Sequence, residues 1–248
     1  MDYLERTYRE QHRQEDLVHF QITVQETDLD IGVRRERFSP ELVGWIEETI
    51  RACRKPLEEY IRQDPGFLKA LVPYGVPEHA PLIVKAMAEA GQSAGVGPMA
   101  AVAGAVAEWV GKAIVKRSRD VIVENGGDIF IRSTRLRKVG IFAGNSPLSN
   151  RVALEIRPEQ TPLGICTSSG KVGPSLSFGK ADAVVVLSPS VALADAVATA
   201  CGNLVQSEED LERTIEFASQ IPGVSGCLVI KNERLAVWGS VKIMPMKV

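Results

Sequence analysis

The sequence has few residues of the kinds that support metal, redox or disulfide chemistry. Its 248 residues include only 4 cysteines and 3 histidines. The cysteines are widely spaced without a CxxC pair, and no histidine follows His79. This scarcity argues against a zinc site. Reduced thiols in a cytoplasmic protein are the simplest interpretation.

The sequence also lacks an excess of either charge and lacks a long apolar run. The formal net charge is −2, and basic and acidic residues alternate near the N-terminus, so the electrostatic signature of nucleic-acid binding is absent. Residues 96–110 and 181–200 are apolar but are interrupted by Gly, Asp, Ser or Pro before about 20 residues accumulate. The charged start has no signal-peptide core. We expect a cytoplasmic protein that binds neither nucleic acid nor membrane.

Alternation and capping patterns predict the elements of the N-terminal third. Residues 16–36 alternate apolar and polar side chains, which predicts a hairpin broken at Thr27-Asp28. Ser39 and Pro40 form a helix start, and that helix should bend or stop near Pro56. Residues 63–81 hold four prolines and are the best linker candidate, although their apolar residues suggest packing against the body.

The remaining patterns predict an α+β fold over a single domain, residues 1–248. Helices are expected at 82–90, 97–115, 191–204 and 208–219, and strands at 121–123, 129–131, 139–143, 152–156, 165–167, 183–187, 227–230 and 235–238. Short links such as Gly126-Gly127 suit antiparallel pairing. Runs of strands separated by runs of helices favour largely antiparallel sheets, with small-residue helices packed on them, over a doubly wound parallel sheet.

A first candidate site lies on the helix expected near 191–204. Asp195 and Thr199 are four residues apart, so a helix places them on one face. A carboxylate and a hydroxyl among small apolar residues could bind a hard cation such as Mg²⁺. Alternatively, Asp195 interacts with the helix dipole and Thr199 bonds back to the preceding turn.

Two further candidate segments are turns beside predicted strands. In Asn125-Gly126-Gly127-Asp128 the glycines would let backbone amides approach a ligand, but an ordinary hairpin turn has the same signature. Thr167-Ser168-Ser169-Gly170 could hold a phosphate, or it could be a polar surface loop. It is not a Walker A loop, because Val172 stands where Ser or Thr is required.

A fourth segment, residues 94–108, carries many glycines and alanines into a helix N-terminus. Such a start can receive an anion, whereas small residues more often indicate close helix packing.

Taken in order, the four segments resemble the ApbE-type flavin transferases. Those proteins carry a small-residue helix, a GGD turn, an SG loop and an ADxxxT helix. Their counterparts here are Gly104 with Glu108, Gly126-Gly127-Asp128, Ser169-Gly170, and Ala194-Asp195 with Thr199. Over nearly the whole chain the sequence is most similar to an uncharacterised ApbE-like family, through the runs VGPMAAVAGAVAE, VENGGD, GICTSSG, SFGKADAVV and ADAVATACGN.

The resemblance implies an ApbE-like (T-fold-like) domain that binds FAD or a related small-molecule nucleotide with Mg²⁺. Carried over, Asp195 and Thr199 are metal ligands, with a backbone carbonyl near residues 100–102 as a third. Asn125, Gly126, Gly127, Asp128, Thr167, Ser168, Ser169 and Gly170 then belong to the cofactor-binding site. A homodimer and a redox or sulfur-transfer protein partner are further expectations.

Three departures set this chain apart from the flavin transferases. The family places a histidine between the SG loop and the ADxxxT helix, where this chain has none. Ala103 replaces the lysine before the helix glycine, and Pro174 stands where the closer family would have histidine. Acid–base work by histidine is therefore absent, so nucleotide binding is expected and FMN transfer to another protein is in doubt.

Two other functions stay open at this point. Proteins resembling this family are associated with sulfur assimilation into homocysteine in anaerobes, and Cys166, beside the serine loop, could then act as a thiol. Its simpler interpretation is a small buried hydrophobic residue. The second alternative is a non-catalytic assembly protein.

Overall fold

The computed structural model describes residues 14–169 and 179–246 and contains two antiparallel sheets. The large sheet has the strand order β1-β2-β3-β4-β7-β8-β9-β10 and the small one the order β11-β6-β5. The large sheet comprises β1 (Leu17–Val24), β2 (Thr27–Arg34), β3 (Val121–Asn125), β4 (Asp128–Arg132), β7 (Leu163–Ser168), β8 (Ala183–Ser188), β9 (Gly226–Lys231) and β10 (Arg234–Gly239). The small sheet comprises β5 (Arg137–Gly140), β6 (Val152–Ile156) and β11 (Ile243–Pro245).

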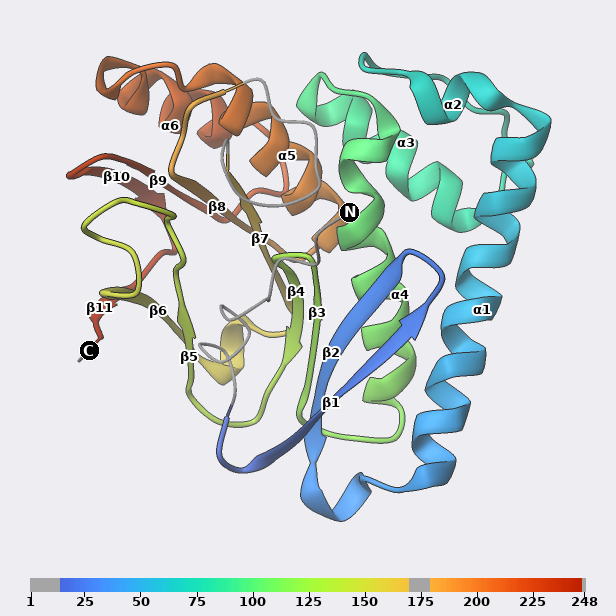
Figure 1. The fold of residues 1–248 in the computed structure, drawn as a ribbon. Coiled ribbons are helices and arrows are strands. Elements are labelled where there is room, and N and C mark those ends of the chain that lie inside the picture. Colours follow the sequence, from blue (N-terminus) through green and yellow to red (C-terminus); the bar gives the residue numbers. More distant parts are fainter. Residues whose placement is uncertain (1–13, 170–178, 247–248) are drawn as a thin grey trace.

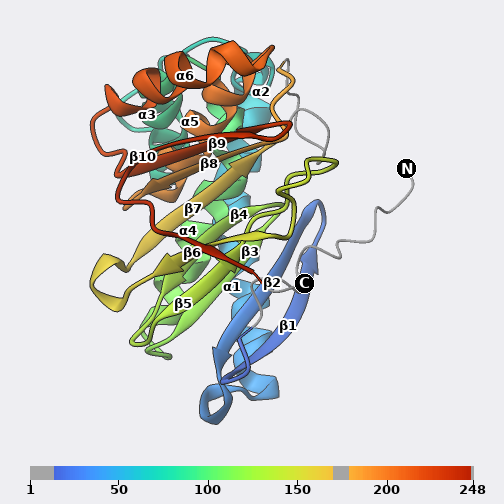
Figure 2. The same ribbon diagram turned by 90° about the vertical axis from the view of Figure 1, so that its left-hand side faces the viewer.

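The six α-helices of the described residues lie on one side of the large sheet, and the small sheet lies on its other face (Figures 1 and 2). The helices are α1 (Pro40–Gln63), α2 (Pro65–Lys69), α3 (Leu82–Ala94), α4 (Val102–Val115), α5 (Val191–Leu204) and α6 (Leu211–Ser219). A 3-10 turn, Pro98–Ala101, leads into α4. This arrangement confirms the predicted α+β class with largely antiparallel sheets.

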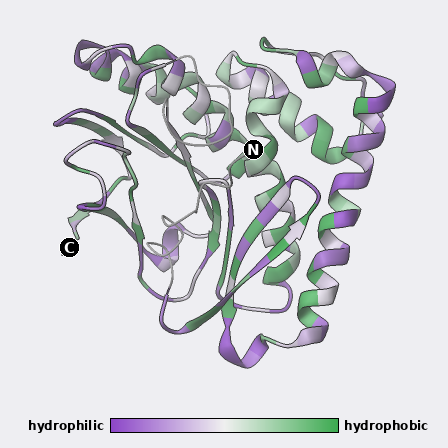
Figure 3. Ribbon diagram, viewed as in Figure 1, coloured by the Kyte–Doolittle hydropathy of each residue, from purple (hydrophilic) through white to green (hydrophobic). Residues whose placement is uncertain are grey.

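Two hydrophobic cores result, because successive residues of a strand point to opposite faces. On β3, Val121 and Val123 face the helices, whereas Ile122 faces the core between the two sheets. The helices complete the first core with one apolar side each. Along α1 this is visible as alternating hydrophobic and hydrophilic bands (Figure 3), and Ile46 and Ile50 on its inner side are fully buried.

Several predicted boundaries were wrong for identifiable reasons. The β1–β2 turn is at Gln25-Glu26, with Gln25 at a φ of 54°, rather than at Thr27-Asp28. Helix α1 continues through Pro56 to Gln63, because a periodic row of buried residues on both sides of the proline anchors it to the core. Helix α3 runs on to Ala94, where Gly95 ends it in the left-handed region. The sequence patterns did not predict strand β11 at Ile243–Pro245.

Residues 63–81 pack against the body of the protein, as their apolar residues suggested. The segment contains α2, whose Phe67 is fully buried. The Phe67 ring meets the rings of Tyr60 and Tyr74 edge to face, at centroid distances of 5.3 and 6.1 Å. These contacts anchor the proline-rich loop at both ends of α2.

One helical stretch, Pro98–Val115, is long and apolar enough to cross a membrane by length and composition alone. Half of it is buried inside the protein, as in a core helix that packs between α5 and the sheet. The expectation that this protein does not enter a membrane stays a prediction.

Candidate functional site

The candidate site begins with a close approach of α4 to α5. A Cβ atom on Gly104 would lie 2.5 Å from the Val191 carbonyl oxygen and 2.8 Å from Cβ of Asp195. Only glycine fits at that contact. The same holds at Gly111, where a Cβ would overlap the Phe130 ring. The packing interpretation of the small residues in 94–108 is therefore confirmed, and it brings Asp195 against the start of α4.

Asp195 is a buried carboxylate held between the two helices. Asp195 is 8% exposed, and its Oδ2 accepts a hydrogen bond of 2.8 Å from the Gly104 backbone N–H. Burial raises the pKa of Asp195 to about 7, although hydrogen bonds from the backbone of Gly104 and Ala103 oppose the rise.

Asp128 is a second buried carboxylate facing the same region from β4. Burial raises its pKa well above the ordinary value, and the nearby negative charge of Asp195 raises the pKa further. In the described part of the chain, no lysine or arginine forms an ion pair with either carboxylate. Burial and mutual repulsion thus disfavour the charged forms of both Asp128 and Asp195 in the absence of a cation.

The GGD segment is a tight two-residue hairpin turn, as the simpler interpretation predicted. Gly126 and Gly127 have φ values of 67° and 106°, which glycine adopts without strain. Beside the turn, the Asn125 side chain donates a 3.0 Å hydrogen bond to the Ala103 carbonyl. That bond ties the turn to α4, so the position of Asp128 is coupled to the helix that contacts Asp195.

The serine-rich segment lies next to the same turn. The Thr167 backbone donates a hydrogen bond to the Asp128 carboxylate and thereby lowers its pKa. Ser168 ends β7 opposite Val184, and Ser169 follows it. Of the predicted Ser169-Gly170 pair, only Ser169 belongs to the described residues; Gly170 lies outside them. The structure therefore brings Thr167–Ser169 and the GGD turn together.

Thr199 lies one helical turn after Asp195 on α5 and is half-buried. The 3-10 turn Pro98–Ala101 packs against the same helix. The Asp195 carboxylate and the Thr199 hydroxyl therefore lie on one side of a helix that also contacts this turn. Among the residues that the structure describes, no group of three or more His, Cys, Asp or Glu side chains is arranged to hold a metal ion.

The N-terminus of α5 is capped by a residue whose role the sequence did not reveal. Glu108 on α4 accepts hydrogen bonds from the backbone N–H groups of Val191 and Ala192, at 2.7 and 3.2 Å. The Lys112 ammonium lies 2.5 Å from the other oxygen of Glu108. Glu108 therefore places the negative charge at the positive end of the α5 dipole, a role that was considered for Asp195. Asp195 lies beyond the first turn of α5, where the free backbone N–H groups end.

Cys166 matches its simpler interpretation. The residue is fully buried, and its Sγ donates a weak hydrogen bond to the Val191 carbonyl at 3.4 Å. Burial and the charges of Asp128 and Asp195 raise the pKa of this thiol well above its ordinary value. A thiol kept protonated and buried is a poor nucleophile, so this geometry gives no support to a sulfur-transfer role for Cys166.

Neither His19 nor His79 reaches the site. His19 lies on β1 with its Nδ1 2.8 Å from Oδ1 of Asp30. Asn125 on β3 faces α4, so the preceding residue, Glu124, faces away from the helices. Asp30 pairs with Glu124 across the strands and shares its face. The His19–Asp30 pair therefore lies on the face of the sheet opposite the candidate site. His79 is exposed in the loop before α3.

Comparison with known proteins places these features in a family. A family model described as "AbpE bacteria" matches residues 9–221. The chain belongs to this family. It is 43% identical over 225 residues to a UPF0280 protein of Methanosarcina acetivorans, covering 90% of this chain and 86% of that protein. It is 46% identical over 205 residues to a UPF0280 protein of Methanothrix thermoacetophila, covering 82% and 86%.

Solved structures show the same fold at low sequence identity. The apo flavinyl transferase ApbE of Pseudomonas stutzeri superposes with a TM-score of 0.58 at 12% identity, covering 90% of this chain and 94% of that one. The ApbE protein of Thermotoga maritima gives 0.55 at 12% identity, covering 90% and 97%. The predicted ApbE-like family and fold are both confirmed.

Proposed function

We propose that this protein binds a flavin nucleotide of the FAD type together with Mg²⁺, where α5, the start of α4 and the β3–β4 turn meet. The observation that carries this proposal is the pair of buried carboxylates, Asp128 and Asp195, which lack a basic partner among the described residues. Buried carboxyl groups with strongly raised pKa values cluster at functional sites. A divalent cation would offset the charge of these carboxylates.

The donor atoms available along α5 fit Mg²⁺ rather than a softer metal. We propose the Asp195 carboxylate and the Thr199 hydroxyl as ligands, with a backbone carbonyl from residues 100–102 as the third. All three are oxygen donors, which Mg²⁺ prefers. When bound, the ion would neutralise a diphosphate and polarise its phosphoryl group.

The neighbouring turn and loop suit the nucleotide. Among the described residues, a Cβ on Gly126 would meet no atom within 4 Å, so on their side the GGD turn leaves room for an incoming group. Ser168 and Ser169 extend from the strand beside it. We assign phosphate contacts to the backbone of Gly126-Gly127 and to the hydroxyls of this loop, while Asn125 and Asp128 hold the turn against α4 and α5.

Binding, rather than rapid FMN transfer, is the function that these residues support. His19 and His79 lie away from the site, and Cys166 is a buried, protonated thiol. In this proposal Asp195 binds the metal and Asp128 holds the turn, so no histidine or thiol among the described residues of the site is available as a general base for an acceptor hydroxyl. The chain's own residues would hold the nucleotide and its metal and exclude water around Asp195.

Thermal-shift measurements with FAD, FMN and ADP, each with and without Mg²⁺, test this proposal. Ligand binding to the native state raises the unfolding temperature by mass action. We expect a Mg²⁺-dependent shift with FAD that is lost in Thr199→Ala. The matched control is Thr49→Ala, because Thr49 is also a half-buried helical threonine but lies on α1.

A shift that persists in Thr199→Ala would remove Thr199 from the metal site. The absence of a shift with every nucleotide, in the presence of Mg²⁺, would refute the proposed function itself.

A further inference from the structure

Strand β10 forms an unprotected edge of the large sheet. Within the described residues it pairs with β9 on one side and has no strand on the other. Edge strands usually carry lysine, proline or a bulge that discourages pairing with another chain. After Arg234, β10 carries only Leu235-Ala236-Val237-Trp238-Gly239, and Val237 is 36% exposed.

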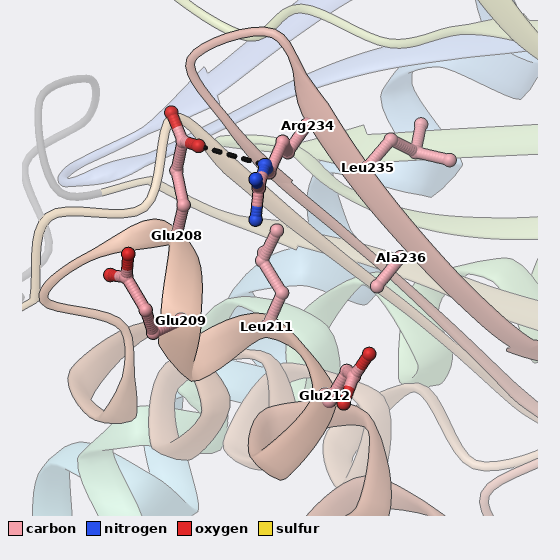
Figure 4. A pocket seen from close by; sticks show the side chains of 7 residues that line it. All are labelled: Glu208, Glu209, Leu211, Glu212, Arg234, Leu235 and Ala236. Carbon is pink, nitrogen blue, oxygen red and sulfur yellow. Dashed lines mark ion pairs between the residues drawn. The ribbon is translucent and has the colours of Figure 1, made fainter.

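An acidic groove runs beside this edge, between β10 and the start of α6. Its volume is about 600 Å³, and Glu208, Glu209, Glu212, Arg234 and Leu235 are among its lining residues (Figure 4). Arg234 is committed to Glu208, with its Nε 3.0 Å from the carboxylate. Glu209 and Glu212 form no ion pair with any described lysine or arginine. The groove therefore keeps a negative potential next to open backbone groups.

Further carboxylates follow on α6, which packs against β9 and β10, and together with Glu209 they form an acidic stripe. Glu212 and Glu216 are four residues apart on α6 and therefore share one helical face. Glu209 lies just before the helix, in the 3-10 turn Glu208–Asp210. Glu212 and Glu216 are about 6 Å apart along the helix axis. Alternate side chains of a β-strand are about 6.6 Å apart, so a strand with a basic residue at every second position would match this spacing.

We propose that the β10 edge binds an extended segment of another protein, added as a strand, whose lysine or arginine residues at alternate positions contact Glu209, Glu212 and Glu216. Backbone hydrogen bonds to the edge would supply affinity and the acidic stripe would supply specificity. A second copy of this chain fits less well. Two-fold pairing of β10 with itself would bring two acidic stripes side by side.

The register of the β9–β10 hairpin indicates which backbone groups would accept the segment. Arg234 pairs with Lys231 across the two-residue turn. Because antiparallel pairs alternate between bonded and non-bonded, the N–H groups of Leu235 and Val237 point away from β9. Val237→Pro therefore removes an outward donor without breaking a β9–β10 bond, and proline is tolerated on an edge strand.

The test uses the full-length protein and three fluorescent eight-residue peptides, with binding followed by fluorescence anisotropy at low salt. The first peptide alternates lysine with threonine or valine, the second contains the same residues with the lysines grouped together, and the third has glutamate for lysine. The protein variants are Val237→Pro and Glu212→Gln/Glu216→Gln. Glu89→Gln, an exposed position on α3, is the matched control. Circular dichroism confirms that each variant is folded.

We expect the alternating peptide alone to bind, with its affinity reduced about threefold for each carboxylate removed and abolished by Val237→Pro. Glu89→Gln should leave the affinity unchanged. Equal binding of the alternating and grouped peptides, or unchanged binding to folded Val237→Pro, would overturn strand addition. A dimer in light scattering that Val237→Pro converts to a monomer would assign the edge to a second copy and overturn the proposal.

Discussion

Replacing Asp195 with asparagine should stabilise the ligand-free protein and abolish its response to Mg²⁺ and FAD. The substitution removes a buried charge but keeps an oxygen that can accept the 2.8 Å hydrogen bond from Gly104. It also removes the negative charge that raises the pKa of Asp128. A residue that binds a ligand but lowers the stability of the ligand-free protein is expected to give a more stable, non-binding variant when it is replaced.

The size of the gain follows from the pKa of Asp195, which burial raises from 3.8 to about 7. A carboxyl group with a higher pKa in the folded state binds its proton more tightly there. The tighter proton binding stabilises the folded state fully when the pH is below the pKa of the unfolded chain, 3.8. This stabilisation is lost as the pH rises through the pKa of the folded state, about 7. At about 1.4 kcal/mol for each pH unit between the two values, the loss is on the order of 4 kcal/mol at a pH of about 8.

Thermal unfolding at pH values of about 5 and 8 measures this effect. With about 3 °C per kcal/mol for a chain of this size, Asp195→Asn should unfold roughly 10 °C higher than the wild type at pH 8. The advantage should fall by about half at pH 5. Added Mg²⁺ and FAD should raise the unfolding temperature of the wild type and of Glu89→Gln but leave Asp195→Asn unchanged.

The reasoning would be refuted by an Asp195→Asn protein that is less stable than the wild type at pH 8 and still responds to Mg²⁺ and FAD. Asp195 would then be a structural acceptor for the start of α4, without a role in metal binding.

Three other measurements probe the backbone, the thiol and the chemistry of the site. Gly127→Val should lower the free energy of unfolding by about 1–3 kcal/mol, because a β-branched residue is strained at the φ of 106° found there. Urea denaturation checks this against Gly75→Val, an exposed glycine with open space around it, and equal stability of the two variants would contradict it. Cys166 should resist iodoacetamide in the native protein and react after unfolding, because its thiol is buried and its pKa is raised; rapid native labelling, detected by peptide mass spectrometry, would show that the thiol is accessible. Incubation with FAD, Mg²⁺ and a threonine-containing acceptor should give no rapid FMN adduct by mass spectrometry, since general acid–base help is worth ~100-fold or more and neither His19 nor His79 lies at the site. A rapid adduct would mean that another group performs this step.

Local patterns in the sequence determined most of the secondary structure. The alternation in residues 16–36 predicted the β1–β2 hairpin, and the Ser39 cap predicted the start of α1, where the Ser39 hydroxyl accepts from the Leu42 N–H. The four motif segments, taken in order, also pointed to the ApbE-like fold through their resemblance to a known family. The hairpin and the helix cap depend on neighbours within a few residues of one another, so they are readable without the tertiary structure.

Tertiary contacts decided where the local signals were weak or in conflict. Pro56 should kink or end a helix by its own chemistry, yet burial of Cys53 and Leu57 on either side keeps α1 from ending there. The short strand β11 lacks a pattern of its own and exists because its residues pair with Val152–Leu154 of β6. Neither outcome can be read from a window of adjacent residues.

The candidate site shows the same division. Its residue types were evident in the sequence, and the Asp195–Thr199 spacing placed both on one side of α5. Only the fold brings the Asp128 carboxylate on β4 close enough to Asp195 to raise its pKa, and only the fold places Glu108 on the N-terminus of a helix 83 residues away. Burial and electrostatic coupling depend on which distant elements pack together, and that is set by the closure of the sheet and helices into one structure.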